Sequence, residues 1–222
     1  EVHHVIEEKL KGITSYFWGG AVRQPIFHVM YGGQSITDDW DIIADDSSQE
    51  QPLELDQIFE KEIKEGKASL NRYDIIKWIP RLGVEIDISR FSNANMVRNK
   101  ETEERSLEVS LASCDFNTGA IAYGLQDDLI YDGGAIQGLK DRIVELQYAD
   151  DQPHILIARL IMHSNDMRFA IGPAALHFIK HRYTIITQEK INQKIEEYLQ
   201  RKGKTKRFEE ITERLTEIDS NK

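Results

Sequence analysis

The chain of 222 residues is 40% hydrophobic and 30% charged, with a formal net charge of -10 at pH 7. This composition is ordinary for a water-soluble globular protein, and the length fits one domain, or one domain with a helical extension. It contains no apolar run near the roughly 20 residues that a membrane-spanning helix needs, so we expect no membrane association. The acidic balance excludes tight, nonspecific binding of nucleic acid by the whole surface, because such binding depends on Lys and Arg side chains that neutralise phosphates.

The single cysteine indicates the cellular compartment, and the uneven charge indicates which end of the chain could contact nucleic acid. Cys114 alone can form neither an internal disulfide nor a multi-cysteine zinc site, which favours a reducing compartment. We therefore expect a cytoplasmic protein, and an organelle matrix stays open because the sequence begins with Glu1 rather than Met. Residues 38–62 are strongly acidic, whereas the last quarter is locally basic. Any nucleic acid is expected to contact the basic side chains there: Lys190, Lys194, Arg201, Lys202, Lys204, Lys206 and Arg207.

The first quarter of the chain alternates helical and strand-like patterns, with glycines between them. In order, the patterns predict an amphipathic helix over residues 1–11, a strand over 13–18, a helix from about 21 to 31, a loop over 32–35 and a strand over 40–44. Gly19 and Gly20 stop the first strand. The helix that follows therefore points its N-terminus, which favours anions, at the glycine turn.

The rest of the chain predicts a hairpin followed by mainly helical segments. In order, we expect a helix over 53–63, hairpin arms over 73–79 and 84–89 around a turn at 80–83, an irregular stretch over 92–107, a helix over 115–125, a strand and turn over 129–134, core-facing segments over 139–144 and 155–161, a helix from 188 to 203, and a charged helix or tail. In the second hairpin arm the apolar and polar residues alternate strictly. Glu85 and Asp87 therefore share one face of that strand.

Two carboxylates at the start of the second strand predict chemistry on phosphate. Asp39 and Asp41 are two residues apart, so on a strand they point to the same face and can hold a hard cation such as Mg2+. The paired glycines let backbone N–H groups approach phosphates that such a metal also contacts. If the strand over 84–89 lies beside this one, Glu85 or Asp87 adds a third carboxylate.

These motifs, in this order, resemble the catalytic head of the bacterial-type CCA-adding enzyme and poly(A) polymerase family, within the polymerase-beta-like nucleotidyltransferase superfamily. The similarity rests on G-G-A-V-R at residues 19–23, the D-x-D of Asp39 and Asp41, and Glu85 with Arg90 five positions later. Residues 114–120 resemble the family motif R-R-D-F-T-I-N-A, residues 136–143 resemble G-I-E-D-L-K-x-K-I, and residues 153–160 weakly resemble the arginine-rich helix that opens the family's neck.

The resemblance implies an α+β fold and a metal site. It implies a nucleotidyltransferase head with a mixed β-sheet flanked by helices over residues 1–146, followed by an α-helical neck and a charged C-terminal segment over 147–222. Asp39 and Asp41 would bind two Mg2+ (or Mn2+) ions. Glu85, favoured over Asp87 by its spacing to Arg90, would bind one metal and help deprotonate the attacking hydroxyl.

The resemblance also implies a nucleotide site. Gly19 and Gly20 would cradle the triphosphate of an NTP, and Arg23 would support that loop. Asp115 would contact the ribose hydroxyl, although an N-cap of the helix expected after it is an equal alternative. Arg159 is the nearest candidate for the neck arginine.

The sequence departs from the family at several nucleotide-binding positions. Gln24 replaces an Asp, Ser113 and Cys114 replace the arginine pair, and Asn117 and Gly119 replace the Thr and Asn of the same motif. Two strong, charge-assisted phosphate donors are therefore lost. The chain also ends before the body and tail that grip tRNA in the full-length family, so a CCA-adding role needs further sequence or a protein partner.

The resulting prediction is a metal-dependent nucleotidyltransferase that transfers a nucleotide from an NTP to a hydroxyl, with an RNA 3′ end as the acceptor. Addition of CCA to tRNA and poly(A) polymerase-like tailing both fit this reaction. Two alternatives stay open. One is transfer to a protein side chain or a small molecule. The other is a degenerate head that serves as a binding or assembly module and has lost catalysis.

Overall fold

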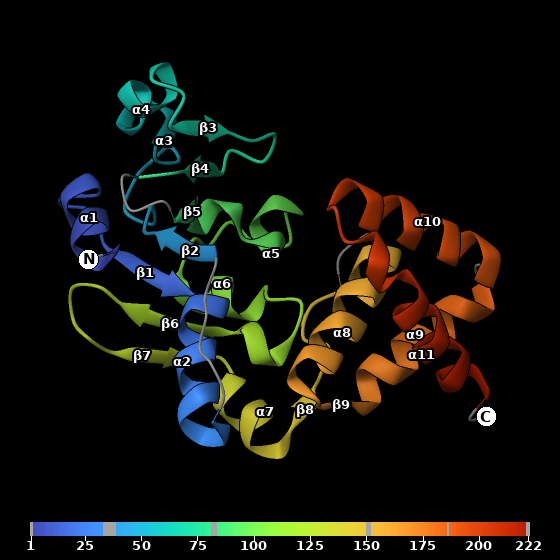
Figure 1. Cartoon of the computed structure of the whole chain (residues 1–222). Helices are drawn as coiled ribbons and strands as arrows, with labels where there is room; N and C mark the ends of the chain where they lie inside the picture. Colours follow the sequence, from blue (N-terminus) through green and yellow to red (C-terminus); the bar gives the residue numbers. More distant parts are fainter. Residues whose placement is uncertain (1, 33–38, 81–83, 150–151, 186, 221–222) are drawn as a thin grey trace. The chain divides into compact units, whose positions relative to one another are not determined.

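The computed structural model describes residues 2–32, 39–80, 84–149, 152–185 and 187–220, without the side chains of residues 39 and 183–185 (Figure 1). Its contacts divide the chain into two compact units. The first contains Glu1–Cys114 and Thr118–Ala135, and the second contains Asp115–Asn117 and Ile136–Lys222. The predicted division into a head over 1–146 and a neck over 147–222 stays a prediction.

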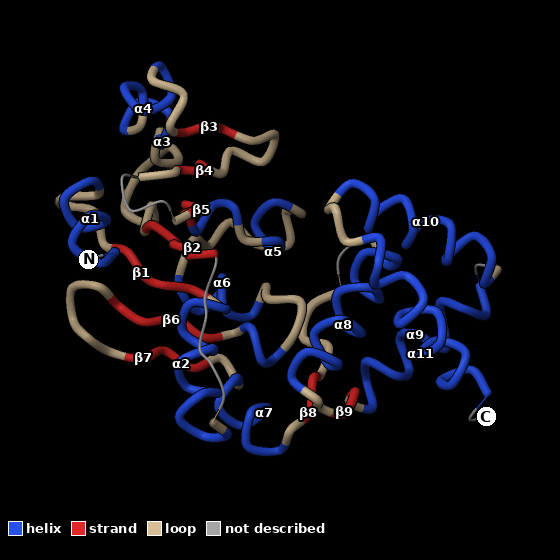
Figure 2. The backbone as a smooth tube through the Cα atoms, viewed as in Figure 1, coloured by secondary structure: helices blue, strands red, loops and turns tan. Residues whose placement is uncertain are grey.

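The first unit is built on a mixed sheet of seven strands in the order β3-β4-β5-β2-β1-β6-β7 (Figure 2). The strands are β1 (Ser15–Trp18), β2 (Asp39–Ala44), β3 (Ala68–Leu70), β4 (Ile76–Trp78), β5 (Glu85–Arg90), β6 (Ile121–Gly124) and β7 (Ile130–Asp132). Only the β2–β5 pair is parallel, and the other neighbours are antiparallel. The prediction of an α+β fold with a mixed sheet and flanking helices is confirmed.

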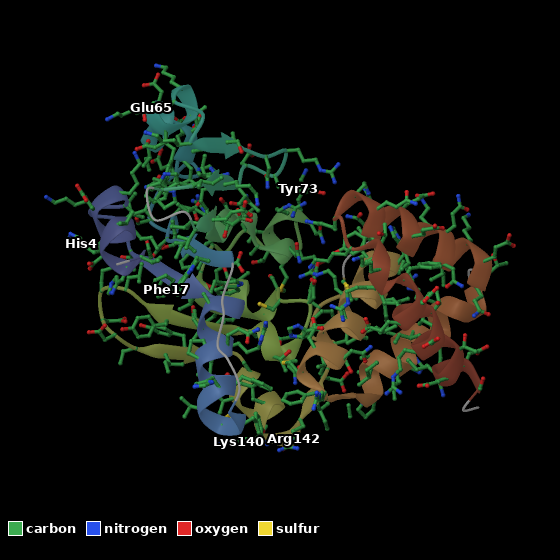
Figure 3. All side chains as sticks on the ribbon, viewed as in Figure 1. His4, Phe17, Glu65, Tyr73, Lys140 and Arg142 are labelled. Carbon is green, nitrogen blue, oxygen red and sulfur yellow. The ribbon has the colours of Figure 1, made fainter. Side chains whose placement is uncertain are left out.

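Short helices flank this sheet. They are α1 (Val2–Lys9), α2 (Gly20–Tyr31), α3 (Leu55–Ile58), α4 (Glu60–Lys64), α5 (Asn95–Arg98) and α6 (Leu107–Ala112), with 3-10 turns η1 (Phe91–Asn93) and η2 (Asn117–Gly119). One sheet face carries a core in which Tyr16 and Ile43 pack with Leu107 and Leu111 of α6. On the other face Phe17 of β1, labelled in Figure 3, contacts the rings of Trp40 and Tyr123.

Strand β5 shows why alternation predicted its position well. Ile86 and Ile88 are fully buried on one face, whereas Glu85 and Asp87 on the other are half-buried. This pattern is what a strand with one apolar and one polar face requires. The hairpin predicted from it is confirmed by the antiparallel pairing of β4 with β5. The residues 81–83 of its turn, like residues 33–35 of the first predicted loop, lie outside the described residues.

The helix predicted over residues 115–125 is wrong. A 3-10 turn occupies Asn117–Gly119, and Ile121–Gly124 is strand β6, which lies between β1 and β7. Ala120, Ile121 and Ala122 are all fully buried. A strand that is buried on both faces loses the alternation by which sequence separates it from a helix.

Two smaller differences concern helices. The helix predicted over 53–63 is broken at Phe59, whose backbone leaves the helical region between α3 and α4. The stretch over 92–107, expected to be irregular, contains α5. The other predicted segments of this unit are confirmed within a few residues, including α1, β1, α2 and β2.

The second unit is mainly helical. It contains most of α7 (Ala135–Asp141), then β8 (Ile143–Val144), α8 (Pro153–Met167), β9 (Ala170–Ile171), α9 (Pro173–Ile185), α10 (Gln188–Arg201), η3 (Thr205–Arg207) and α11 (Phe208–Ser220). Strands β8 and β9 pair in parallel. The predicted core-facing segments are confirmed, because Leu139, Val144, Ile157 and Ile161 are fully buried. Among the described helices, none combines the length and apolar character needed to cross a membrane.

Candidate active site

The parallel register of β2 and β5 brings the predicted carboxylates together. Asp39 lies directly opposite Glu85, and Asp41 lies directly opposite Asp87. Directly paired residues of neighbouring strands point to the same face of a sheet. Both rows therefore belong to one face, and the condition that the sequence left open, adjacency of the two strands, is met (Figure 1). The register keeps both Glu85 and Asp87 as candidates for the third carboxylate.

The second of these rows continues across the sheet. Trp18 of β1 pairs with Asp41 on one side, and Lys77 of β4 pairs with Asp87 on the other. The Lys77 ammonium donates a hydrogen bond to the Glu85 carboxylate and lies 3.5 Å from Asp87 Oδ1. Partial burial alone would lower the pKa of Lys77, but the hydrogen bond to Glu85 and the charge of Asp87 outweigh it, so the pKa is raised. Lys77 therefore stays protonated between the two carboxylates.

The residues on this face suit a hard divalent cation. Among the side chains that the structure describes, no group of three or more His, Cys, Asp or Glu is close enough to hold a metal ion. The side chain of Asp39 is not part of that description. The Lys77 ammonium nevertheless shows that Glu85 and Asp87 converge on one positive charge. Carboxylate oxygens are the donors that Mg2+ prefers, so the donor chemistry fits the metal that the sequence predicts.

The two glycines form the turn between β1 and α2, immediately after Trp18. Gly19 has φ 51°, a left-handed conformation that favours glycine. Its carbonyl accepts from Arg23 N at 2.8 Å, while its own N–H donates to Ile121 O at 2.9 Å. Because Trp18 pairs with Asp41, the turn begins one residue from the carboxylate row.

Arg23 lies on the first turn of α2, above the glycine turn. A Cβ atom at Gly20 would lie 3.7 Å from the Arg23 guanidinium, which places that side chain beside Gly20. The structure thus brings Gly19, Gly20, Arg23 and Asp41 into one region of the first unit.

In the second unit, Asp115 and Arg159 form an ion pair. The Asp115 side chain is 10% exposed and that of Arg159 is 51% exposed, so the pair reaches the surface through the arginine. Burial raises the pKa of Tyr198 on α10. The charge of Arg159 lowers this pKa and the charge of Asp115 raises it further. The α-helix that Asp115 was expected to cap is replaced by the 3-10 turn η2 and strand β6.

The positions that depart from the family motif make structural contacts. Asn117 Oδ1 accepts from Glu145 N at 2.9 Å and its Nδ2 donates to Ile143 O at 3.2 Å, which ties the 3-10 turn to the strand β8 region. Ser113 Oγ donates to Val109 O at 2.7 Å at the end of α6. These side chains are engaged with the backbone of their own unit.

Lys77 is the site residue that sequence reasoning missed. A hairpin folded symmetrically about the predicted turn at 80–83 pairs residue 77 with residue 86, whereas the structure pairs Lys77 with Asp87, a register that differs by one residue. A single lysine between Ile76 and Trp78 in an apolar arm was available to mark a cation on the carboxylate face.

Comparisons with solved structures identify the fold. The chain resembles a nucleotidyltransferase enzyme fold. More specifically, the chain has the fold of the head and neck region of CCA-adding enzymes. An apo CCA-adding enzyme matches with a TM-score of 0.67 and 18% identity, over 99% of this chain and 50% of the other.

Two ligand-bound structures match similarly. A CCA-adding enzyme in complex with CTP has a TM-score of 0.63 and 19% identity, over 99% of this chain and 51% of the other. The Thermotoga maritima CCA-adding enzyme in complex with tRNA has a TM-score of 0.57 and 19% identity, over 89% of this chain and 46% of the other. The chain thus spans about half the length of the enzymes that it matches. No protein-family model and no curated protein matches the sequence.

Proposed function

We propose that this chain is the catalytic head of a metal-dependent nucleotidyltransferase that transfers a nucleotide from an NTP to the 3′ hydroxyl of an RNA such as tRNA. The observation that carries the proposal is the parallel register of β2 and β5, which pairs Asp39 with Glu85 and Asp41 with Asp87 on one sheet face. A fold shared with CCA-adding enzymes, some of them solved with CTP, ATP or tRNA, supports the choice of reaction.

In this proposal the carboxylates bind the metal, and one of them accepts a proton. Asp39, Asp41 and Glu85 bind Mg2+ or Mn2+, which when bound neutralises charge on the transferring phosphoryl group and lowers the pKa of the attacking hydroxyl. Glu85 also accepts the proton of that hydroxyl, whose oxygen forms a bond to the α-phosphorus of the NTP as pyrophosphate leaves. The roles of these three residues follow from their positions on the strands and from the family resemblance.

The remaining proposed residues hold the nucleotide. Gly19 and Gly20 cradle the triphosphate. The Gly19 N–H already donates to Ile121 O, so Gly19 shapes the turn, and the N-terminus of α2, which begins at Gly20, binds the phosphates because such a helix end favours negative charge. Arg23 supports this turn. Asp115 binds the ribose hydroxyl and Arg159 holds Asp115 in place or contacts the nucleotide directly. The RNA contacts the basic side chains of the C-terminal region.

The test is incorporation of label from each of the four NTPs into tRNA or mixed RNA, with Mg2+ or Mn2+. We expect Asp41→Asn to abolish incorporation, and Asp56→Asn, which changes an exposed carboxylate on α3, to behave as wild type. Absence of label from every RNA, or equal activity of Asp41→Asn and wild type, would falsify the proposal. Label found in protein or small molecules instead of RNA would keep the chemistry and change the acceptor.

A further inference from the structure

Lys77 reaches the carboxylate face because its neighbours bury the opposite one. Ile76 and Trp78, on either side of it in β4, are buried, and Trp78 packs against the ring of Phe59 at 5.3 Å between centroids. Side chains alternate along a strand, so Lys77 must point away from this apolar layer. The direction of its side chain is therefore set by core packing.

The face that Lys77 reaches carries a high density of negative charge. Asp41 and Asp87 are directly opposite each other on neighbouring strands, where like charges repel. Glu85 adds a further carboxylate within hydrogen-bonding distance of the Lys77 ammonium. A cation is needed to offset this repulsion, and in the structure Lys77 supplies one.

The contact between Lys77 and the carboxylates is suited to being broken. The Lys77 side chain is 42% exposed, and those of Glu85 and Asp87 are 38% and 36% exposed. Ion pairs with this exposure contribute little, about 0.2–1 kcal/mol, because water can solvate both partners when they separate. A lysine ammonium is a compact charge on a flexible stem, so it can swing into solvent without leaving a buried charge behind.

We propose that Lys77 is an internal counter-cation that holds Glu85 and Asp87 in the metal-free protein and competes with the divalent ion for them. A metal ion that takes Glu85 as a ligand must displace the Lys77 ammonium, so Lys77 weakens metal binding. Before metal binds, Lys77 offsets the carboxylate repulsion between strands β2 and β5. Lys77 is thus a positioning residue for the metal site. The inference rests on the proposed function, since it requires that Glu85 is a metal ligand.

The competition predicts a change in metal affinity. Lys77→Met removes the cation that competes for Glu85 and Asp87, and we expect Mn2+ to bind about two- to thirtyfold more tightly, the range that the loss of two weak ion pairs allows. Without metal, Lys77 no longer offsets the carboxylate repulsion in this variant. We therefore also expect Lys77→Met to melt at a lower temperature than wild type, and to recover more on addition of Mn2+.

The experiment is a titration of the full chain with Mn2+, in which binding is measured by calorimetry or by the electron paramagnetic resonance signal of free Mn2+. Melting curves are recorded at several Mn2+ concentrations. The proteins are wild type, Lys77→Met, Lys77→Arg and the double variant Lys77→Met/Glu85→Gln. Lys67→Met is the matched control, because Lys67 forms an ion pair with Glu65 outside the carboxylate rows.

We expect Lys77→Met to bind Mn2+ more tightly than wild type, and Lys77→Arg and Lys67→Met to bind it about as tightly as wild type. The double variant should lose the increase in Mn2+ affinity. Equal or weaker binding by Lys77→Met, with Mn2+ still bound by wild type, would overturn the role of Lys77 while leaving the proposed function standing. No Mn2+ binding by any of these proteins would overturn both, because the metal site itself would then be absent.

Discussion

Asp39 of β2 lies directly opposite Glu85 of β5, in the one parallel pair of the seven-stranded sheet. This relationship separates the two candidates for the third carboxylate. Glu85 shares a row with the first Asp of the D-x-D motif, whereas Asp87 shares the next row with Asp41. If Glu85 is the metal ligand and proton acceptor, substitution of Glu85 must slow nucleotide incorporation more than substitution of Asp87.

We expect Glu85→Gln to slow nucleotide incorporation by about 100- to 10,000-fold, the range typical of losing a proton acceptor in the reaction. Asp87→Asn, which removes a charge beside Lys77 without removing the proposed ligand, should slow it by less than about tenfold. Single-turnover incorporation with saturating NTP measures both. A larger loss in Asp87→Asn than in Glu85→Gln would assign the role to Asp87.

The ion pair of Asp115 and Arg159 leads to a prediction about sugar selection. If the Asp115 carboxylate accepts a hydrogen bond from the ribose, Asp115→Asn should raise the KM for NTP by about tenfold or more, since a hydrogen bond to a charged group is worth roughly 1.5–3 kcal/mol. The same variant should use NTP and 2′-deoxy-NTP almost equally, provided that the contact is to the 2′ hydroxyl.

The comparison of NTP with 2′-deoxy-NTP within each protein controls for a general loss of structure. A variant that is merely less stable would lose activity on both substrates in proportion. Unchanged discrimination between the two sugars in Asp115→Asn would limit Asp115 to its ion pair with Arg159.

The ion pair between Lys9 of α1 and Glu62 of α4 makes stability depend on pH. The two charged groups are 2.6 Å apart, their side chains are 20% and 18% exposed, and the Lys9 ammonium lies 4.9 Å from the centre of the Phe59 ring. Burial alone would raise the pKa of Glu62, but the hydrogen bond from Lys9, a backbone hydrogen bond and the charges of Lys9 and Lys61 together outweigh burial, so the pKa is lowered. The stabilisation is therefore fully present above the unfolded-state pKa and is lost as the pH falls through the lower folded-state pKa.

We expect Lys9→Met to reduce the free energy of unfolding at pH 7 by about 0.5–1.5 kcal/mol, and to reduce it progressively less as the pH falls, because protonation of Glu62 removes the ion pair. Urea denaturation from pH 3 to pH 7 measures this difference. Lys64→Met is the matched control, because the Lys64 and Glu60 side chains are 69% and 67% exposed and their pair should contribute almost nothing. If the free energies of unfolding of wild type and Lys9→Met differed by the same amount at every pH, the result would contradict the prediction.

The Glu145 carboxylate caps helix α9 from a distant part of the chain. Its Oε1 accepts from Ala175 N at 2.7 Å and its Oε2 accepts from Ala174 N at 3.2 Å, at the first turn of that helix. A Cβ atom at Gly172 would lie 2.3 Å from Glu145 Oε2. An alanine there must push the carboxylate away from the N–H groups that it satisfies.

We expect Gly172→Ala to destabilise the protein by about 1–2 kcal/mol, the usual cost of losing a helix cap. Glu145→Ala should cost a similar amount, and the double variant should cost little more than either alone, because both changes remove the same contact. Gly119→Ala is the control for added bulk, since a Cβ atom there meets nothing within 4 Å. Additive losses in the double variant would show that Gly172 acts through something other than Glu145.

Local signals in the sequence predicted much of the fold and the strand faces that carry the candidate carboxylates. The strict alternation of β5 predicted its polar face, and the glycine pair predicted the turn before α2, because a strand period and a left-handed glycine are properties of adjacent residues. The D-x-D spacing placed Asp39 and Asp41 on one face for the same reason.

What pairs with what was decided only by the tertiary structure. The sequence did not show that β2 and β5 run parallel in register, that Lys77 lies beside Glu85, or that Asp115 pairs with Arg159. Strand β6 was mistaken for a helix because a strand covered on both faces carries no alternation in its residues. Each of these features depends on neighbours that are distant in the chain, and their packing and charge are fixed only when the sheet and the helices assemble.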